Sequence, residues 1–370
     1  MCVTGSIAAI EAPRLARELQ RHGAEVKAYM SEAATRIVHP FTMEFATGEE
    51  PVTEISGALE HLEDYDLIVV APATANTIAK LAHGIGDTPP TLLCLSSRAK
   101  LLIAPAMHLT MHQNRAVREN LQKLKNRGFV IVEPLIAEGA AKMAPVEEIA
   151  EHAIRALGSG ELRNRRVVIT AGATEEEIDA VRIITNRSSG RMGLALAREA
   201  FYRGAEVTLI AGRMGVSPPG YMKVVKALSI AEMRSAVERH TEGAHIFISA
   251  AAIGDFLVER HRGKLSSATE VKLTLRPAPK VLGAGRGAEL RVAFKALYRP
   301  TREEMEKAGR AMLETEELDM VVVNDISQNV FGSEENEVML VTPEEVLTLP
   351  RMSKSSVAEH IFDILVKRLG

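Results

Sequence analysis

Short apolar runs alternate with amphipathic segments along most of the chain. Four such runs lie in the first 160 residues and predict buried strands, at Glu25–Met30, Leu67–Ala71, Lys100–Ala104 and Phe129–Val132. The segments between them carry apolar residues at helical spacing. This alternation of strands and helices predicts an α/β fold built on a parallel sheet.

The same alternation starts again after residue 164. The second set of expected strands is Arg165–Thr170, Glu206–Ala211, His245–Ser249, Leu290–Phe294, Asp319–Val323 and Glu337–Thr342. Between the two sets lies Leu157–Leu162, which is rich in small, flexible residues. We therefore expect two α/β domains, residues 1–157 and 164–370, joined by a linker at 158–163. Met1–Ser6 resembles a strand that is already ending, so we expect either that a few residues of the first strand are missing or that this strand is unusually short.

Composition and charge exclude several classes of protein. The 370 residues are 46% apolar and 25% charged, with 45 basic against 48 acidic residues, so there is no polycationic surface for nucleic acid. Aromatic residues make up 4%, too few for base-stacking platforms. Two cysteines supply neither a disulfide framework nor a zinc site. With no signal peptide and no long apolar run, we expect a cytoplasmic protein that binds neither membrane nor nucleic acid.

Three polar loops of the first domain follow expected strands. They are Thr4–Ala9, Ala71–Thr77 and Ala104–His108. Ligands of open α/β sheets bind outside the carboxyl ends of the strands, so loops that meet there favour a cofactor site with a phosphate group. Three unrelated turns, the first with Ser6 as a helix cap, remain the alternative.

These loops resemble the flavin-containing cysteine decarboxylases, specifically phosphopantothenoylcysteine decarboxylase, over residues 1 to about 157. The resemblance implies a flavodoxin-like sheet that binds FMN, with the cofactor held by Gly5, Ser6, Thr74, Asn76 and Met107. It also implies a catalytic histidine, for which His61 is the candidate, although a solvent-facing helix histidine is the simpler interpretation. The flavin would oxidise the substrate thiol reversibly, so that the carbanion left by CO2 has an electron acceptor.

The chain departs from the decarboxylase pattern at two places. The asparagine that normally follows Pro-Ala-Met is His108, which could still bind the substrate carboxylate. The substrate clamp at Glu138–Met143 has no cysteine, and Lys142 is the nearest candidate to supply the proton. Loss of decarboxylation is therefore an open alternative.

The second domain has its densest group of polar donors at Asn186–Gly193, just before an amphipathic helix. Two serines, two arginines and glycine in so short a stretch favour phosphate binding. Upstream, Thr170–Thr174 could bind a nucleotide, and the acidic run Glu175–Asp179 could bind a cation beside it. A glycine turn before an exposed acidic helix start is the plainer interpretation of those residues.

Thr185–Gly193, Ala250–Phe256 and Val322–Asp325 resemble phosphopantothenate–cysteine ligase, over about 164 to 367. The resemblance implies a Rossmann-like parallel sheet and a CTP-dependent ligation through an acyl-cytidylate. Asn186 and Lys264 would be catalytic, and Asn186 and Arg187 would bind the substrate. The expected nucleotide contacts are Gly172, Thr174, Ser188, Ser189, Gly190, Asp255, Phe294, Asn324 and Lys354. Magnesium is expected because triphosphate charge must be neutralised, and its protein ligands are unknown.

The leading hypothesis is therefore a bifunctional enzyme of coenzyme A biosynthesis that makes phosphopantothenoylcysteine and decarboxylates it to 4′-phosphopantetheine. Two alternatives stay open: a ligase whose first domain is only a flavin-binding oligomerisation scaffold, and a non-enzymatic regulatory subunit. The resemblance also implies a homo-oligomer, with trimeric contacts around flavin sites in the first domain and dimeric contacts in the second.

Overall fold

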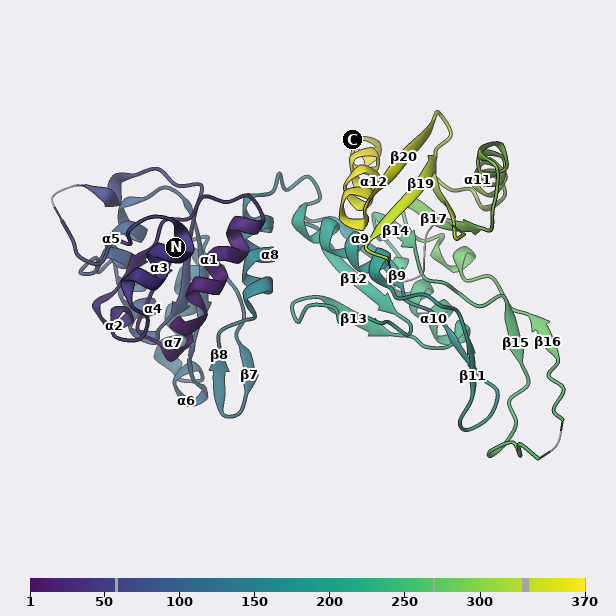
Figure 1. Ribbon diagram of the computed structural model, residues 1–370, viewed down its shortest axis with the longest axis horizontal. Helices are drawn as coiled ribbons and strands as arrows, with labels where there is room; N and C mark the ends of the chain where they lie inside the picture. The colour runs from purple at the N-terminus through teal and green to yellow at the C-terminus, as the bar shows by residue number, and fades with distance from the viewer. Residues whose placement is uncertain (57–58, 269, 328–332, 370) are drawn as a thin grey trace. The chain divides into compact units, whose positions relative to one another are not determined.

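The computed structural model describes residues 1–56, 59–268, 270–327 and 333–369. It divides into two compact units, Met1–Gly158 and Ser159–Gly370 (Figure 1). The first unit ends with helix α8 (Val146–Leu157). Leu162, in the segment expected to be a linker, is fully buried in the core of the second unit, and its amide donates to the Arg203 carbonyl at 2.9 Å.

The first unit contains a parallel sheet, as predicted, and its five strands lie in the order β2-β1-β3-β4-β6. The strands are β1 (Cys2–Val3), β2 (Tyr29–Met30), β3 (Leu67–Ala73), β4 (Lys100–Pro105) and β6 (Val130–Ile131). β2 is shorter than the expected Glu25–Met30, because β1 pairs with it over only two residues. β3 ends two residues later than expected, at Ala73, and its residues from Ile68 to Ala73 are all buried.

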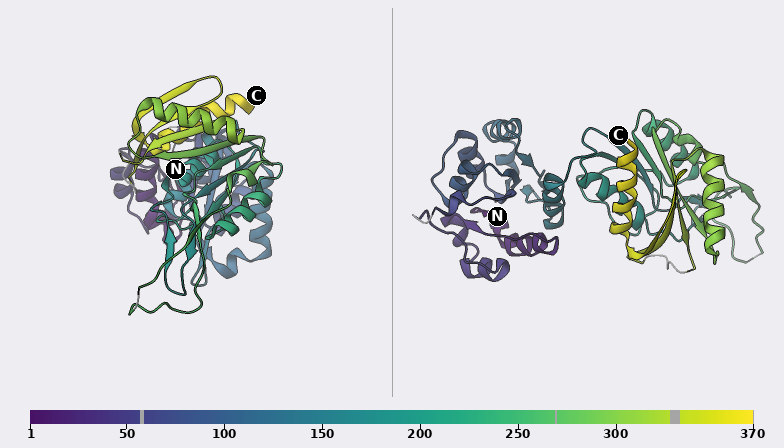
Figure 2. Two further views of the ribbon diagram at one scale, coloured as in Figure 1. Left: turned by 90° about the vertical axis from the view of Figure 1, so that its right-hand side faces the viewer. Right: turned by 90° about the horizontal axis from the view of Figure 1, so that it is seen from above.

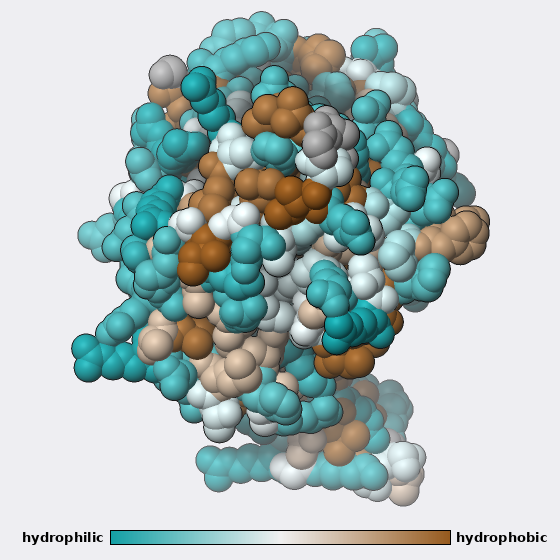
Figure 3. All heavy atoms as spheres, turned by 90° about the vertical axis from the view of Figure 1, so that its left-hand side faces the viewer, coloured by the Kyte–Doolittle hydropathy of each residue, from teal (hydrophilic) through white to brown (hydrophobic). Residues whose placement is uncertain are grey.

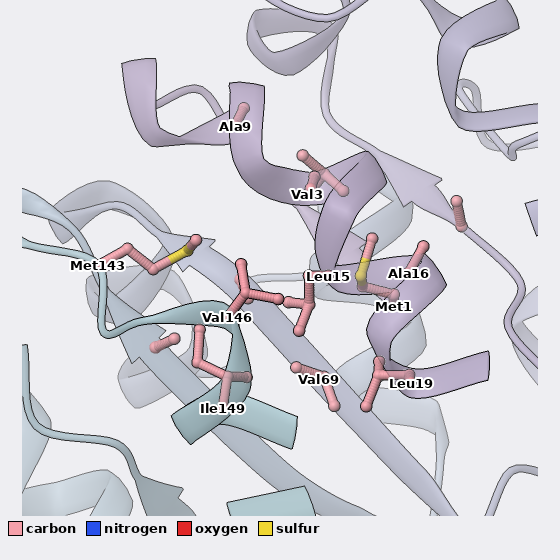
Figure 4. Close-up of a cluster of buried hydrophobic side chains, with 14 of the residues drawn as sticks. Met1, Val3, Ala9, Leu15, Ala16, Leu19, Val69, Met143, Val146 and Ile149 are labelled. Carbon is pink, nitrogen blue, oxygen red and sulfur yellow. The ribbon is translucent and has the colours of Figure 1, made fainter. Parts of the chain in front are cut away.

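Helices cover both faces of this sheet. One face carries α1 (Ala12–Arg21), α3 (Pro40–Thr47) and α8, and the other carries α4 (Ala75–His83), α5 (Pro89–Ser96) and α7 (Arg115–Asn126). Side chains alternate along a strand, so Val69 of β3 packs on the first face, against Leu15 and Leu19 of α1 and Val146 and Ile149 of α8 (Figure 4). Each such side chain stabilises the fold by about 1.5–3 kcal/mol.

Short elements surround the carboxyl edge of the first sheet. They are η1 (Ile7–Glu11), α2 (Glu32–Thr35), α6 (Leu109–His112) and a small antiparallel sheet of β5 (Met107–His108), β8 (Ala140–Lys142) and β7 (Leu135–Ala137). The short helix η2 (Glu60–Leu62) instead precedes β3 and contacts Ser96 at the end of α5. The three-stranded sheet was not predicted, since its strands are only two or three residues long and mostly exposed.

The second unit holds an eight-stranded sheet in the order β13-β12-β9-β14-β17-β18-β19-β20. Its strands are β13 (Lys223–Lys226), β12 (Glu206–Ala211), β9 (Arg166–Ala171), β14 (Ile246–Ser249), β17 (Leu290–Leu297), β18 (Met320–Asp325), β19 (Glu335–Val341) and β20 (Val346–Ser353). In this order the first six strands are parallel, and all of them except β13 were expected. The expected strand Glu337–Thr342 corresponds to β19, which is antiparallel rather than parallel and forms a hairpin with β20 at one edge. β20 escaped prediction because this edge strand buries only Leu349.

Helices α9 (Arg191–Tyr202) and α12 (Lys354–Leu369) cover one face of the second sheet. The other face carries α10 (Ile230–Thr241), α11 (Arg302–Glu316) and η3 (Leu282–Gly285) (Figure 2). This two-faced covering of a mostly parallel sheet is the arrangement that strand–helix alternation predicts.

Two antiparallel hairpins extend from the carboxyl edge of the second sheet (Figure 1). One joins β10 (Glu175–Glu177) to β11 (Ile183–Thr185), and the other joins β15 (Phe256–Val258) to β16 (Leu275–Pro277). The first corrects the expectation of a helix start at Glu175–Asp179. Pairing of Glu175–Glu177 with Ile183–Thr185 gives these acidic residues a strand conformation instead.

Candidate functional site

The predicted cofactor loops of the first unit line one cavity of about 870 Å³. Gly5, Ser6, Thr74, Asn76 and Met107 all contribute to its wall. His108 and Lys142, expected at the substrate, line the same cavity. Its volume is within the usual range for small-molecule sites, so the structure joins loops that are separated by about 100 residues in the sequence into one candidate site.

Hydrogen bonds fix two of these loops. The Thr74 hydroxyl caps α4 by accepting from the Thr77 amide at 3.2 Å, and Ser6 caps η1 by accepting from the Ala8 amide at 3.4 Å. Thr4, which the sequence analysis did not select, links the loops. Its buried hydroxyl donates to the Pro72 carbonyl at 2.7 Å and accepts from the Thr74 amide at 3.1 Å.

The chemistry of the cavity wall fits a flavin. Small residues such as Ala8, Ala75 and Ala106 leave space for a flat ring system, and Ser6 and Asn76 supply hydrogen-bonding groups. Met143 and Val146 line the cavity and also belong to the buried cluster of Figure 4, so that this end of the cavity rests on the core. A wall that is largely apolar with a few convergent polar groups is typical of cofactor sites.

The clamp side of the cavity carries a cation and no thiol among its lining residues. Lys142 of β8 pairs with Glu138 at 2.5 Å, and both side chains are partly exposed. The pairing with Lys142 lowers the pKa of Glu138. Cys2 and Cys94 are both buried in the core cluster below α4 and α5, away from the cavity wall.

His61 does not line this cavity. It lies in η2, where its backbone carbonyl accepts from the Ser96 hydroxyl at 2.6 Å. Its neighbours Ile55, Leu59 and Leu62 are each more than half exposed. Figure 3 shows that apolar side chains also gather on an outer face of the first unit. A single chain therefore does not bring His61 together with Thr74 and Asn76.

The predicted phosphate loop of the second unit contacts the loop after β14. The Asn186 side-chain amide donates to the carbonyls of Ala252 and Ile253 at 3.1 and 3.3 Å. The loop then enters α9 through Gly190, whose φ of +77° favours glycine. Ser188, Ser189 and Arg187 lie on the exposed or half-buried part of this segment, so the donors expected for phosphate are accessible.

Gly172 and Thr174 are buried beneath the candidate nucleotide site. The Thr174 hydroxyl accepts from the Gly254 amide at 2.8 Å, which fixes the loop that carries Asp255. A Cβ atom on Gly172 would lie 2.4 Å from the Arg213 carbonyl oxygen, so this position requires glycine for packing. The structure therefore buries both of these expected nucleotide contacts.

Of the remaining predicted residues, Lys264 is exposed in the irregular segment between β15 and β16, and the others lie on or next to strands and helices of the second sheet. Phe294 and Asn324 lie on the parallel pair β17 and β18, and Asp255 follows β14. Asp255 pairs with Lys280 at 3.0 Å, a partner that no sequence signal indicated. Lys354 begins α12 and donates to the backbone carbonyls of Ser333 and Glu335.

Lys354 also lines a cavity of about 370 Å³ together with Arg191 in the first turn of α9. Burial lowers the pKa of Lys354, and the neighbouring guanidinium of Arg191 lowers it further. The Lys354 ammonium group therefore lies near the first turn of α9, the helix that follows the phosphate loop.

The acidic run does not form the expected cation site. Glu175 pairs with Arg213, Glu176 accepts from the Ile230 amide, and Glu177 pairs with Arg260. Within the described ranges there is no group of three or more His, Cys, Asp or Glu side chains placed to hold a metal ion. Over the same part of the chain, no helix combines the length and apolarity needed to span a membrane.

Both units match known protein families. Residues 1–158 match the Flavoprotein family, and residues 162–369 match the DNA/pantothenate metabolism flavoprotein C-terminal domain. The chain is 46% identical to the Coenzyme A biosynthesis bifunctional protein CoaBC of Thermococcus kodakarensis, with 100% of this chain and 94% of that protein covered. It is 38% identical to the protein of the same name from Methanocaldococcus jannaschii, over 99% and 93%.

A solved structure is also similar. The C-terminal domain of a Coenzyme A biosynthesis bifunctional protein CoaBC matches with 31% identity and a TM-score of 0.47, covering 57% of this chain and 98% of that one. From the two family matches and the full-length similarity to the relatives, the chain belongs to the family of bifunctional coenzyme A biosynthesis flavoproteins.

Proposed function

We propose that the second unit joins 4′-phosphopantothenate to cysteine at the expense of CTP, and that the first unit decarboxylates the product to 4′-phosphopantetheine with FMN. Family membership makes the chain a bifunctional enzyme of coenzyme A biosynthesis. The observation that carries the assignment of residues is the contact between Asn186 and the Ala252–Ile253 carbonyls. This contact joins the phosphate loop to the loop of Asp255.

The ligation proceeds in two steps in this proposal. The substrate carboxylate attacks the α-phosphorus of CTP and releases pyrophosphate, and the amine of cysteine then attacks the acyl carbon and releases CMP and a proton. Arg187, Ser188, Ser189 and Gly190 bind phosphate oxygens through side chains and amides, because a helix N-terminus favours anions. Asn186 orients the reacting acyl group, and Asp255 contacts the cytidine.

Charge on the triphosphate is neutralised by Lys264 and Mg²⁺ in this proposal. Stabilising the charge that develops as pyrophosphate leaves is worth several kcal/mol in related chemistry. The described residues do not provide a cluster of metal ligands, so we infer that Mg²⁺ enters with the triphosphate rather than on a preformed protein site.

The decarboxylase half uses the cavity of the first unit. FMN, held by Gly5, Ser6, Thr74, Asn76 and Met107, supplies reversible two-electron oxidation of the substrate thiol, which makes loss of CO2 feasible. The chain's own groups then handle charge and protons. His108 binds the substrate carboxylate, and the Lys142 ammonium group carries a proton at the cavity wall, where Glu138 holds it.

His61 acts in this proposal on the cavity of an adjoining copy. Two observations support this role for His61. It does not line the cavity of its own chain, and the apolar residues Ile55, Leu59 and Leu62 near it are exposed. A surface of this kind is typical of contacts between subunits. We further propose a trimer of the first unit and a dimer of the second, which the family resemblance implies.

One observation favours a second candidate function. The clamp at Glu138–Lys142 brings no thiol to the cavity wall, and His108 replaces an asparagine expected from the family pattern. If the thiol is indispensable, the first unit binds flavin and assembles the oligomer without turnover, and the chain is a ligase alone.

The two half-reactions test the proposal separately. Full-length protein given phosphopantothenate and CTP without cysteine should release pyrophosphate, and protein given phosphopantothenoylcysteine should release CO2. Asn186→Asp should reduce formation of the amide by about 100-fold, since a carboxylate cannot donate to the Ala252 carbonyl. Asn126→Asp on exposed α7 adds the same charge and should leave both rates unchanged. Unchanged amide formation in Asn186→Asp would overturn the assignment of Asn186.

A further inference from the structure

The tip of the β10–β11 hairpin is joined to the segment that carries Lys264. The Ala180 amide donates to the Gly263 carbonyl at 3.0 Å, and the His261 amide donates to the Ile178 carbonyl at 2.8 Å. These two segments are about 80 residues apart in the sequence. Figure 1 shows the β10–β11 hairpin and the β15–β16 hairpin extending from the sheet as long arms.

A buried carboxylate adds a further connection between the two segments. The Asp179 side chain has no exposed surface. Its Oδ1 atom accepts from the amides of Val181 and Arg182 at 2.8 and 2.7 Å, which completes the turn of its own hairpin. Its Oδ2 atom accepts from the Leu265 amide at 3.0 Å and pairs with the Arg182 guanidinium at 2.5 Å.

The charge of this carboxylate is well compensated. Burial by itself would raise the pKa of Asp179, but the amides of Leu265, Val181 and Arg182, followed by the Arg182 guanidinium, outweigh burial and hold the pKa well below its usual value. A buried carboxylate that accepts several hydrogen bonds stays ionised. Arg182 also reaches the Leu265 carbonyl at 3.3 Å, so both backbone groups of Leu265 are held from the hairpin.

We propose that Asp179 is a positioning residue for the ligase: by holding the Leu265 amide it fixes the backbone beside Lys264 and so sets where the Lys264 ammonium group stands relative to the triphosphate of CTP. The inference rests on the proposed role of Lys264. Lys264 is exposed and lies in an irregular segment between β15 and β16, so its own element does not fix it. Glu177 and Arg260 also connect the arms, but both side chains are exposed, and such pairs contribute little.

Two substitutions in the full-length protein remove the contact. Asp179→Asn keeps one acceptor oxygen for the hairpin turn and places an NH2 group against the Leu265 amide and the Arg182 guanidinium. Leu265→Pro removes the amide hydrogen that Asp179 accepts and leaves its other three donors in place, so it tests the same contact if the first variant folds poorly. Proline also fixes φ at 265 and restricts the backbone of Lys264, so the exchange and kinetic results of this variant are compared with those of Asp179→Asn. Glu177→Gln is the matched control, since it removes the exposed link between the same two arms.

The first readout is amide hydrogen exchange in residues 260–265, or in residues 260–264 for Leu265→Pro, which has no amide hydrogen at 265. This readout needs no enzyme activity. Asp179→Asn should exchange at least about tenfold faster there than the wild-type protein, because an amide loses its charged acceptor. Glu177→Gln should exchange at the wild-type rate. Wild-type exchange in both Asp179→Asn and Leu265→Pro would overturn the proposal.

The second readout is kinetic. Asp179→Asn and Leu265→Pro should lower kcat/KM for CTP by about tenfold, with the KM for cysteine unchanged. In a Lys264→Ala background the same substitutions should cost less than about twofold, because residues that act through one another are not additive. Equal losses in both backgrounds would show a general structural role and overturn the proposal. A wild-type protein that makes no amide would overturn the proposed function, while the exchange experiment would still decide whether Asp179 fixes the segment.

Discussion

The Thr4 hydroxyl lies 3.1 Å from the Thr74 amide nitrogen and joins the end of β1 to the loop that follows β3. The second unit repeats this arrangement. There the buried Thr170 hydroxyl, near the end of β9, accepts from the Ala251 amide at 3.1 Å. In both units a buried threonine near the carboxyl end of a strand ties down the neighbouring loop of the candidate site.

Thr4→Val should weaken flavin binding in the first unit. Valine has the shape of threonine but leaves the half-buried Thr74 amide and the buried Pro72 carbonyl without their partner, which costs about 1–3 kcal/mol. Urea unfolding and titration of the apoprotein with FMN measure the two effects. Thr35→Val, whose hydroxyl bonds on the surface of α2, is the control. Wild-type FMN affinity in Thr4→Val would remove this threonine from the site.

Lys142→Met should stop CO2 release without preventing flavin binding. Methionine keeps the length of the side chain but carries no proton, and loss of a general acid costs about 10²–10⁴-fold in rate. Turnover of phosphopantothenoylcysteine gives the rate, and the flavin absorbance of the purified protein gives the cofactor content. Lys123→Met, on the outer surface of α7, should behave as wild type. A rate within twofold of wild type would place the proton donor elsewhere.

Gly193→Ala should destabilise the second unit. A Cβ atom at this position would lie 2.5 Å from the Ala171 Cβ, so α9 and β9 would have to separate, at a cost of about 1–3 kcal/mol. Gly283→Ala, where no atom lies within 4 Å, is the control. Adding Ala171→Gly should recover stability in urea unfolding. A Gly193→Ala protein as stable as Gly283→Ala would contradict the close packing of α9 on β9.

The stability of the first unit should fall in mild acid because of His152. Burial, with a smaller contribution from Arg155, lowers the pKa of His152 to about 4. The folded state therefore keeps this histidine neutral, while the unfolded chain binds a proton below about pH 6.5, so stability is lost as the pH falls from about 6.5 to about 4. The total loss is up to about 3 kcal/mol, from a difference of about 2.5 pKa units.

His152→Gln removes this titration and should flatten the pH dependence of urea unfolding between pH 6.5 and 4. Exposed His83→Gln should retain the wild-type dependence. An unchanged slope in His152→Gln would show that other groups cause the acid sensitivity.

The sequence predicted the elements that bury apolar side chains on both faces. β12 matches its expected range, and β3, β4 and β9 differ by one or two residues at their ends, because central strands carry a continuous apolar signal. The two exposed hairpins of the second unit were missed for the opposite reason. β10 consists of three glutamates, which suggest a helix start until their pairing with β11 is seen.

The same distinction applies to the candidate sites. Loops next to strand ends could be predicted to meet, and Ser6, Thr74 and Asn76 do share a cavity. Contacts between residues far apart in the sequence could not be predicted from the sequence. Lys280 meets Asp255 from a separate segment, and Asp179 holds Leu265 from another hairpin. The position of His61 was not explained by a single chain, because the residues expected to act with it, Thr74 and Asn76, line a cavity that His61 does not reach.

The most direct test of the bifunctional account is one incubation of the full-length protein with 4′-phosphopantothenate, cysteine, CTP and Mg²⁺, followed by mass spectrometry of the products and measurement of CO2. The account predicts 4′-phosphopantetheine and one CO2 for each CMP released. Accumulation of phosphopantothenoylcysteine without CO2 would contradict the decarboxylase assignment and leave a ligase, and the absence of any amide product would contradict the account as a whole.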